Sequence, residues 1–326
     1  MKITILTYLD SENDKTVDVA VKQVATALRS KKHQVSILGV HGDVHKLMRG
    51  LRRRKPDLVF NMMEMFGDDA TADYPIAALM DVMKIRYTGS GPAELLLTQD
   101  KVLAKKVLAF ENIQFPRFAV FSTAANMETG GNLRLPLFVK PSRMDASIGI
   151  GATSLVHDTM TMMKRVVTIH EELDDAALAE EYIEGREFYV GVLGNRDLQA
   201  LPPIEMDFSG LPDGVPHVAD RAAKWDESSK EFKGTRSVLA QIPDELRARL
   251  QKVSTDAYRA LSVKDYGRVD LRLTDTGEIY VLEVNASCYL EKSAEFAVAA
   301  RAAGMEFPDL VQRIVDLAMT RYTKKK

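Results

Sequence analysis

Cysteine is almost absent from the 326-residue sequence, which contains only Cys288. A single cysteine excludes an internal disulfide framework and is typical of proteins from a reducing compartment. No segment approaches the roughly 18 consecutive apolar residues of a membrane span, and the apolar start is too short for a signal peptide. With a formal net charge of −2, no overall field directs the chain to nucleic acid or membrane. We therefore expect a cytoplasmic protein with neither as a partner.

The remaining composition is that of a soluble globular protein. Hydrophobic residues make up 46% of the chain and charged residues 28%, enough apolar side chains for a sizeable core. The length predicts about two or three domains. The basic run Arg49–Lys55 comes directly before Pro56, and a solvated helix end explains it better than a nucleic-acid patch.

The first ninety or so residues alternate between strand and helix patterns. Apolar strands are predicted over 3–9, 34–40 and 57–63, and helices over 17–28 and 75–83. This βαβ rhythm predicts an α/β unit with a parallel sheet covered by helices. No Gly-x-Gly-x-x-Gly follows the first strand, which weakens a dinucleotide-binding interpretation.

Two further units are predicted after a turn at 87–92. The second begins with a helix over 98–112, with Thr98 as its N-cap, and continues with strands over 117–121, 135–142 and 176–183 and a helix near 159–170. The third has a strand at 186–194, a long polar loop at 202–234, a helix at 243–261, a hairpin at 266–285 and a helix from Phe307. Such a long loop in a compact domain is usually functional or disordered.

The hairpin at 266–285 carries polar residues at alternate positions on both strands. Arg268 and Asp270 share one face of the first strand, and Glu283 and Asn285 share one face of the second. If the strands pair around Gly277, two carboxylates and an amide oxygen converge beside one arginine, a donor set that suits Mg²⁺. Alternation alone favours a solvent-facing hairpin, and the asparagine at the end of an apolar strand brings the two interpretations level.

Three other segments contain candidate site residues. Lys140 ends an apolar strand before a Ser/Gly loop and could hold phosphate oxygens, although a surface lysine is the simpler interpretation. Glu187 follows an acidic Gly turn that could border a planar base or be an ordinary turn. Lys224 and Trp225 lie in the long loop, where a tryptophan usually anchors the loop and could also anchor a lid.

Taken in order, these segments resemble ATP-grasp ligases, and specifically the D-alanine–D-alanine ligase family. The resemblance covers nearly the whole chain and depends on ordered segments at family-like spacing. The segments are YTGSG, DK, VKPSRMDASIG, EEYIEGREF, AKW, YGRVDLRL, EVNAS and AARAAGMEFPDLV.

The resemblance implies a three-domain ATP-grasp fold, α/β with α+β parts. The domains would be an N-terminal βαβ domain at 1–95, a central subdomain at 96–182 and a C-terminal subdomain at 183–326 with a lid at about 205–236, ATP lying between the last two. Related ligases are often homodimers, so a homodimer is expected.

The resemblance also implies roles for individual residues. ATP would be bound by Lys101, Lys140, Ser142, Ser147, Glu180, Glu181, Ile183, Glu187, Lys224 and Leu282. Magnesium, as one or two ions with Mn²⁺ as an alternative, would be held by Asp270, Glu283 and Asn285. Arg268 and Lys224 would be catalytic, and substrate contacts would come from Glu12, Trp225, Ser287, Tyr289 and Glu291.

The sequence departs from the family mainly where amino-acid substrates would bind. The glycines expected beside Glu12 are missing, Ala146 replaces the first of two serines, and Trp225 replaces a tyrosine or phenylalanine. The family pattern Asn-Thr-x-Pro-Gly-Met appears as Asn-Ala-Ser-Cys-Tyr-Leu over 285–290, and Ala294-Glu295 replaces Ser-Leu.

The resemblance implies an ATP-dependent carboxylate–amine ligase that acts through an acyl phosphate, and the departures predict amino-acid or peptide substrates other than the D-alanine pair. A true D-alanine–D-alanine ligase and a non-catalytic ATP-binding regulator are the alternatives. Cys288 is interpreted as a packing residue, because this chemistry needs no thiol nucleophile and no histidine lies nearby in sequence.

Overall fold

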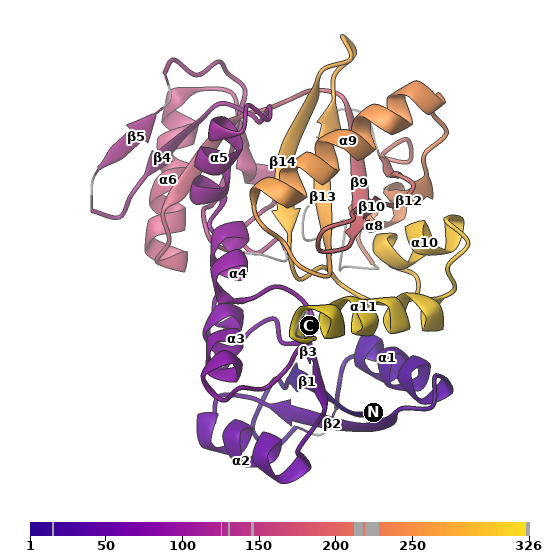
Figure 1. Ribbon diagram of the computed structural model, residues 1–326. Coiled ribbons are helices and arrows are strands. Elements are labelled where there is room, and N and C mark those ends of the chain that lie inside the picture. Colours follow the sequence, from indigo (N-terminus) through magenta and orange to yellow (C-terminus); the bar gives the residue numbers. More distant parts are fainter. Residues whose placement is uncertain are drawn as a thin grey trace.

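Three separate sheets organise the protein in the computed structural model, which describes residues 1–14, 16–124, 126–129, 131–144, 147–211, 218 and 228–323. The first sheet is parallel, with strand order β2–β1–β3, and belongs to the N-terminal part of the chain. The second and third are antiparallel, with orders β5–β4–β8–β6–β7 and β12–β11–β9–β13–β14, and β10 pairs with β9. Figure 1 shows the parallel sheet at the bottom and the two antiparallel sheets above it.

The N-terminal part confirms the predicted βαβ rhythm. Its elements are β1 (Lys2–Tyr8), α1 (Val19–Ser30), β2 (Gln34–Val40), α2 (Val44–Arg54), β3 (Leu58–Met62), α3 (Asp73–Val82) and α4 (Pro92–Gln99). Ile3, Ile5 and Leu6 of β1 are almost fully buried, as expected for a central parallel strand covered on both faces. Arg52 and Arg53 are exposed in the last turn of α2, which confirms that the basic run is a solvated helix end.

The central part corrects one predicted helix. It contains α5 (Lys101–Phe110), β4 (Phe118–Phe121), β5 (Met127–Thr129), β6 (Leu137–Pro141), β7 (Leu155–Val156), α6 (Thr159–Leu173) and β8 (Ala177–Glu181). The single helix predicted over 98–112 is instead two helices, because Asp100 leaves the helical conformation and its side chain accepts from the backbone N–H groups of Val102 and Leu103. Asp100, not Thr98, is therefore the N-cap.

The C-terminal part contains the predicted hairpin and more structure than expected in the long loop. Its elements are β9 (Arg186–Leu193), β10 (Gln199–Ala200), β11 (Ile204–Asp207), α8 (Lys230–Gly234), β12 (Arg236–Leu239), α9 (Asp244–Ala260), β13 (Tyr266–Leu273), β14 (Ile279–Asn285), α10 (Glu295–Ala302) and α11 (Phe307–Tyr322). The predicted loop at 202–234 contains β11 and α8, so that prediction was too coarse. Gly277 adopts φ +85° in the hairpin turn, as the turn requires.

The N-terminal and C-terminal parts share their apolar cores. Leu28 of α1 packs in one buried cluster with Leu310 and Ile314 of α11, and α11 lies directly above α1 in Figure 1. The central sheet has a smaller core of its own around Val139, Ile169 and Ala179. The described strands of each sheet fall within 1–95, 96–182 and 183–326 respectively; the division into three domains stays a prediction. None of the described helices combines the length and apolarity needed to cross a bilayer.

Candidate active site

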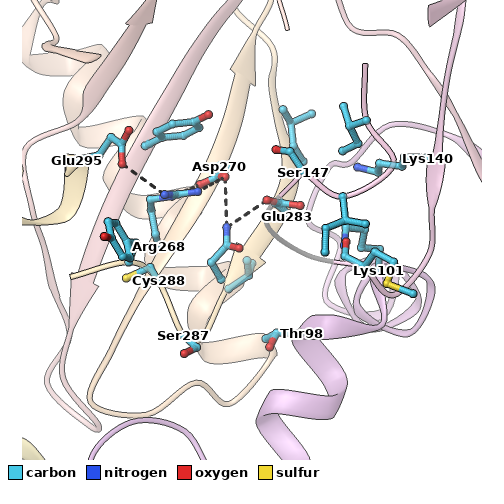
Figure 2. A pocket seen from close by; sticks show the side chains of 18 of the residues that line it. Thr98, Lys101, Lys140, Ser147, Arg268, Asp270, Glu283, Ser287, Cys288 and Glu295 are labelled. Atoms are coloured by element: carbon cyan, nitrogen blue, oxygen red, sulfur yellow. Dashed lines mark hydrogen bonds and ion pairs between the residues drawn. The ribbon is translucent and has the colours of Figure 1, made fainter. Parts of the chain in front are cut away.

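A cavity of about 880 Å³ opens between the central and C-terminal sheets and extends to the N-terminal part. Its lining comes from β6 and β8 on one side, β9, β13 and β14 on the other, and α4, α5 and the segment after β14. This volume is in the range of small-molecule and cofactor sites. Figure 2 shows the labelled polar side chains facing this space from both sides.

The hairpin places its four polar residues together at one wall of the cavity. Arg268 lies opposite Asn285 and Asp270 opposite Glu283 in the register of β13 and β14. Arg268 donates to Asp270 through both Nε (2.7 Å) and Nη2 (2.8 Å), the two-pronged geometry that makes arginine–carboxylate pairs strong. The solvent-facing interpretation of the hairpin is therefore wrong, since all four residues line the cavity and Asp270 is 3% exposed.

Arg268 is held on three sides. Its guanidinium carbon lies 4.4 Å from the centre of the Tyr189 ring, and Nη1 lies 3.5 Å from Glu295 Oε2. Burial acts to lower the pKa of Arg268, but Asp270 and Glu295 outweigh it and keep the pKa above its ordinary value. The arginine is thus a fixed positive charge at the cavity wall.

Asp270, Glu283 and Asn285 are the side chains that a divalent cation would meet at this wall. Among the described residues, no three His, Cys, Asp or Glu side chains are placed to hold a metal. However, Asn285 Nδ2 lies 3.2 Å from Asp270 Oδ2 and 3.3 Å from Glu283 Oε1. The amide group of Asn285 therefore lies between the two carboxylates and forms a hydrogen bond to each. An amide also offers an oxygen, and two carboxylates with an amide oxygen are hard ligands that suit Mg²⁺. These three residues fit the ion that the sequence implies.

A buried cluster of two lysines and one glutamate lies across the cavity. Glu180 of β8 places Oε1 2.9 Å from Lys105 Nζ and Oε2 3.0 Å from Lys140 Nζ. The three side chains are 4%, 2% and 7% exposed, respectively. Two ammonium groups face one carboxylate, so the three side chains together carry one net positive charge; Lys140 and Glu180 line the cavity, whereas Lys105 does not.

The pKa directions in this cluster follow from its burial and from its two lysines facing one glutamate. Burial lowers the pKa of Lys105, and the like charge of Lys140 lowers it further, although Glu180 acts in the opposite direction. Burial acts to raise the pKa of Glu180, but two lysines outweigh it and the pKa is lowered. The carboxylate is therefore well compensated, while the Lys105 ammonium is only partly compensated.

Lys101 and Ser147 also line the cavity, whereas Ser142 does not. Lys101 Nζ donates to the carbonyl of Met144 at 2.8 Å, and its backbone N–H donates to the Ser142 carbonyl. The Ser142 hydroxyl donates to buried Asp175 at 3.0 Å, so it fixes the start of the loop. Ser147 has φ +59°, an uncommon conformation for a residue other than glycine that often accompanies functional loops.

Residues around β8 and β9 form the remaining wall. Glu181, Ile183, Glu187 and Leu282 all line the cavity. Glu187 pairs with Arg272 Nη2 at 2.5 Å and accepts from the Tyr189 hydroxyl at 2.8 Å. The turn between the strands depends on Gly185, since a Cβ there would lie 2.0 Å from the Leu273 carbonyl oxygen.

Comparison with known proteins decides the family. The model described as D-ala D-ala ligase C-terminus matches residues 106–316. The chain is 31% identical over 307 residues to a D-alanine–D-alanine ligase from Desulforudis audaxviator, with 92% of each protein covered. It is 31% identical over 269 residues to the uncharacterized protein y4sG of Sinorhizobium fredii, covering 82% of this chain and 76% of that protein.

The chain belongs to the D-alanine–D-alanine ligase family. Its fold agrees: a structure of the Bacillus anthracis D-alanine–D-alanine ligase complexed with ATP is similar, with a TM-score of 0.75, 22% identity and 98% of each chain covered. The predictions of an ATP-grasp fold and of an ATP-dependent ligase-like enzyme of this family are confirmed.

The segment after β14, where the sequence departs from the D-alanine–D-alanine ligase family, also lines the cavity. Ser287, Cys288, Tyr289 and Glu291 are all part of the lining. Burial raises the pKa of Cys288 to about 12, so the thiol is poorly suited to act as a nucleophile. The Tyr289 hydroxyl donates to the carboxylate of Asp18, at 3.0 and 3.1 Å, and ties the segment to the start of α1.

Besides Ser142, one predicted site residue in the described part of the chain does not line the cavity, and two others cannot be placed. Glu12 accepts from the backbone of Gly42 and Asp43 and pairs with Lys46 at 2.8 Å, and it is not part of the lining. Lys224 and Trp225 lie outside the described residues, as does Ala146.

Sequence reasoning missed Lys105, Tyr189 and Arg272. Lys105 lies one helical turn after Lys101 and on the buried face of α5, and a lysine on an apolar helix face is the signal that could have identified it. Tyr189 lies two residues after Glu187 on β9, and Arg272 lies two residues after Asp270 on β13. Strand alternation placed them on the same face, but nothing in the sequence indicated that this face was the cavity wall.

Proposed function

We propose that the protein is an ATP-dependent carboxylate–amine ligase that forms an amide bond through an acyl phosphate. The convergence of Arg268, Asp270, Glu283 and Asn285 at one cavity wall is the observation that carries this proposal. A non-catalytic ATP-binding regulator would not need an arginine and a set of metal donors in contact with one another.

The ATP phosphates would lie at the positive side of the cavity, near Lys101, Lys140 and Ser147. The net positive charge of the Lys105–Glu180–Lys140 cluster favours an anion there. Glu181, Ile183 and Leu282 would border the adenine and Glu187 the ribose. Lys224 would add a further cation from the long loop and Trp225 would help to anchor that loop as a lid, in keeping with the family resemblance.

The first chemical step brings two anions together. A carboxylate oxygen attacks the γ-phosphorus of ATP, the bond to the ADP oxygen breaks, and an acyl phosphate forms. Two unit charges about 4 Å apart repel by roughly 4 kcal/mol at an effective dielectric near 20. Arg268 opposes this repulsion, and Mg²⁺ held by Asp270, Glu283 and Asn285 would neutralise phosphate charge.

The second step forms the amide. The amine attacks the acyl carbon, phosphate leaves with the electron pair of the broken C–O bond, and the nitrogen loses a proton. We propose that the acids and amines are not the D-alanine pair, because Tyr289 occupies a position where the D-alanine–D-alanine ligase family has glycine and Glu295 replaces a leucine. Ser287, Tyr289 and Glu291 would contact the substrate; Glu12 stays a predicted contact outside the cavity lining.

A phosphate-release screen of the purified protein tests both parts of the proposal. ATP and Mg²⁺ are supplied with D- and L-amino acids and dipeptides, singly and in pairs, and products are identified by mass. Release that depends on a substrate pair supports ligation. Robust turnover with D-alanine alone would favour the true D-alanine–D-alanine ligase, and unchanged turnover of Glu283→Gln would contradict the metal assignment.

The three-domain division, a homodimer and a cytoplasmic location are part of the same proposal.

A further inference from the structure

Hydroxyl groups at one end of the cavity already donate to carboxylates of the protein itself. This acceptor end is the part lined by Tyr189, Ser237, Arg268 and residues 287–289, 291 and 293–295. The pairs are Ser237 Oγ with Glu295 (2.9 Å), Ser293 Oγ with Glu291 (2.6 Å), Tyr289 Oη with Asp18 (3.0 Å) and Tyr189 Oη with Glu187 (2.8 Å). A substrate carboxylate would have to compete for each of these donors.

Arg268 is engaged in the same way. Asp270 takes Nε and one Nη2 hydrogen, and Glu295 lies at Nη1, so two carboxylates compensate its single charge. In the proposed ligation, its remaining N–H groups would serve the reacting oxygen. A free carboxylate on the acceptor amine would add a third negative charge beside Arg268, after those of Asp270 and Glu295. Ser287 and Thr235 also line the cavity, but a neutral hydroxyl does not offset a carboxylate charge.

Among its described lining residues, the acceptor end also has more acidic than basic side chains, with Glu291 and Glu295 against Arg268. Neutral donors hold Asp18 and Glu291, namely the Tyr289 hydroxyl, the Gln23 amide and the Ser293 hydroxyl, and these hydrogen bonds leave both charges in place. Burial raises the pKa of Tyr289, and the charges of Asp18, Glu291 and Glu64 raise it further. A ligand group that is cationic and rich in N–H donors suits such a surface.

We infer that Glu295 selects an acceptor amine that carries a second, cationic amino group and no free carboxylate, that is, a diamine or polyamine. This inference rests on the proposed ligase function and deepens it. The neutral amino group attacks the acyl phosphate, a C–N bond forms, and the C–O bond to phosphate breaks. The distal ammonium stays beside Glu295 and keeps its proton throughout.

Putrescine and ornithine form a matched pair of probes, because ornithine is putrescine with one carboxylate added. Calorimetric titration of the full chain, with Mg²⁺ and a non-hydrolysable ATP analogue, should show putrescine binding at least about tenfold more tightly than ornithine. Glu295→Gln removes the charge and frees Arg268 Nη1, so it should reduce this ratio about tenfold, and Glu295→Asp should restore part of it. Glu171→Gln, at an exposed position on α6, should leave the ratio unchanged.

If Glu295 had only a general structural role, Glu295→Gln would weaken the binding of both probes equally and keep the ratio of their affinities. That result would overturn the inference. Equal or tighter binding of ornithine by the unaltered protein, or no binding of either probe, would also overturn it. Turnover separates this result from the proposed function. Amide formation that prefers carboxylate-bearing acceptors supports the ligase and refutes the selection by Glu295. Selective diamine binding, with no acid–amine pair releasing ADP, supports the subsite and refutes the ligase.

Discussion

Replacing Glu180 by glutamine tests the buried Lys105–Glu180–Lys140 cluster most directly. The substitution keeps the size of the side chain and removes the anion that lies 2.9 Å from one ammonium and 3.0 Å from the other. Removing one partner of a buried ion pair typically costs about 3–5 kcal/mol. With two buried lysines losing their partner, we expect a loss near the upper end, about 5 kcal/mol. At about 2 °C per kcal/mol for a large domain, Tm should fall by about 10 °C.

The loss should depend on pH. Burial already lowers the pKa of Lys105, and Glu180 acts against that shift, so Glu180→Gln should lower the pKa further. Between this lowered pKa and the unfolded value, the unfolded chain binds more protons than the folded one, and stability rises with pH. The deficit of Glu180→Gln relative to the unaltered protein should therefore shrink by more than about 1 kcal/mol between pH 7 and pH 9.5.

Urea unfolding at both pH values provides the measurement. The double variant Lys105→Met/Glu180→Gln should recover a large part of the loss, since it replaces a buried charge by an apolar group of similar length. The exposed substitution Glu171→Gln controls for the loss of one negative charge. A deficit below about 1 kcal/mol, or one of equal size at both pH values, would refute the reasoning.

Three further predictions concern the metal donors, a helix cap and the cysteine. Asp270→Asn should lower ADP release at least about a hundredfold even at saturating Mg²⁺, because it removes a metal donor and the partner of Arg268; an unchanged rate would contradict this. Asp100→Ala should lower the free energy of unfolding by about 1 kcal/mol in urea titration through loss of the α5 cap. Cys288, with a pKa of about 12, should resist iodoacetamide at pH 8 in the folded protein and react after unfolding, as mass spectrometry would show.

The hairpin could be predicted from the sequence because its information is local. Alternation fixes which side chains of one strand share a face, and the turn around Gly277 fixes the pairing of Leu271 with Val281. That register alone would place Asp270 opposite Leu282, and a bulge between Asp270 and Leu271 shifts it so that Asp270 lies opposite Glu283. Which face of the hairpin is buried depends on other sheets, and the sequence left that choice open.

The lysine–glutamate cluster could not be predicted because its members come from α5, β6 and β8. Only the packing of that helix against the central sheet brings Lys105 to Glu180. The break between α4 and α5 was missed for a related reason: Thr98 and Asp100 are both good caps, and pattern alone did not show that the chain changes direction at the second.

Among the described residues, the two ends of the cavity differ in the ion pairs that lie there, and this difference suggests an order for the substrates. Two lysines share one glutamate at the phosphate end, whereas two carboxylates share Arg268 at the acceptor end. A phosphorylated carboxylate is drawn toward the first end and a cationic amine toward the second. Because Arg268 belongs to the acceptor end, the attack of the amine on the acyl carbon would take place beside this fixed cation.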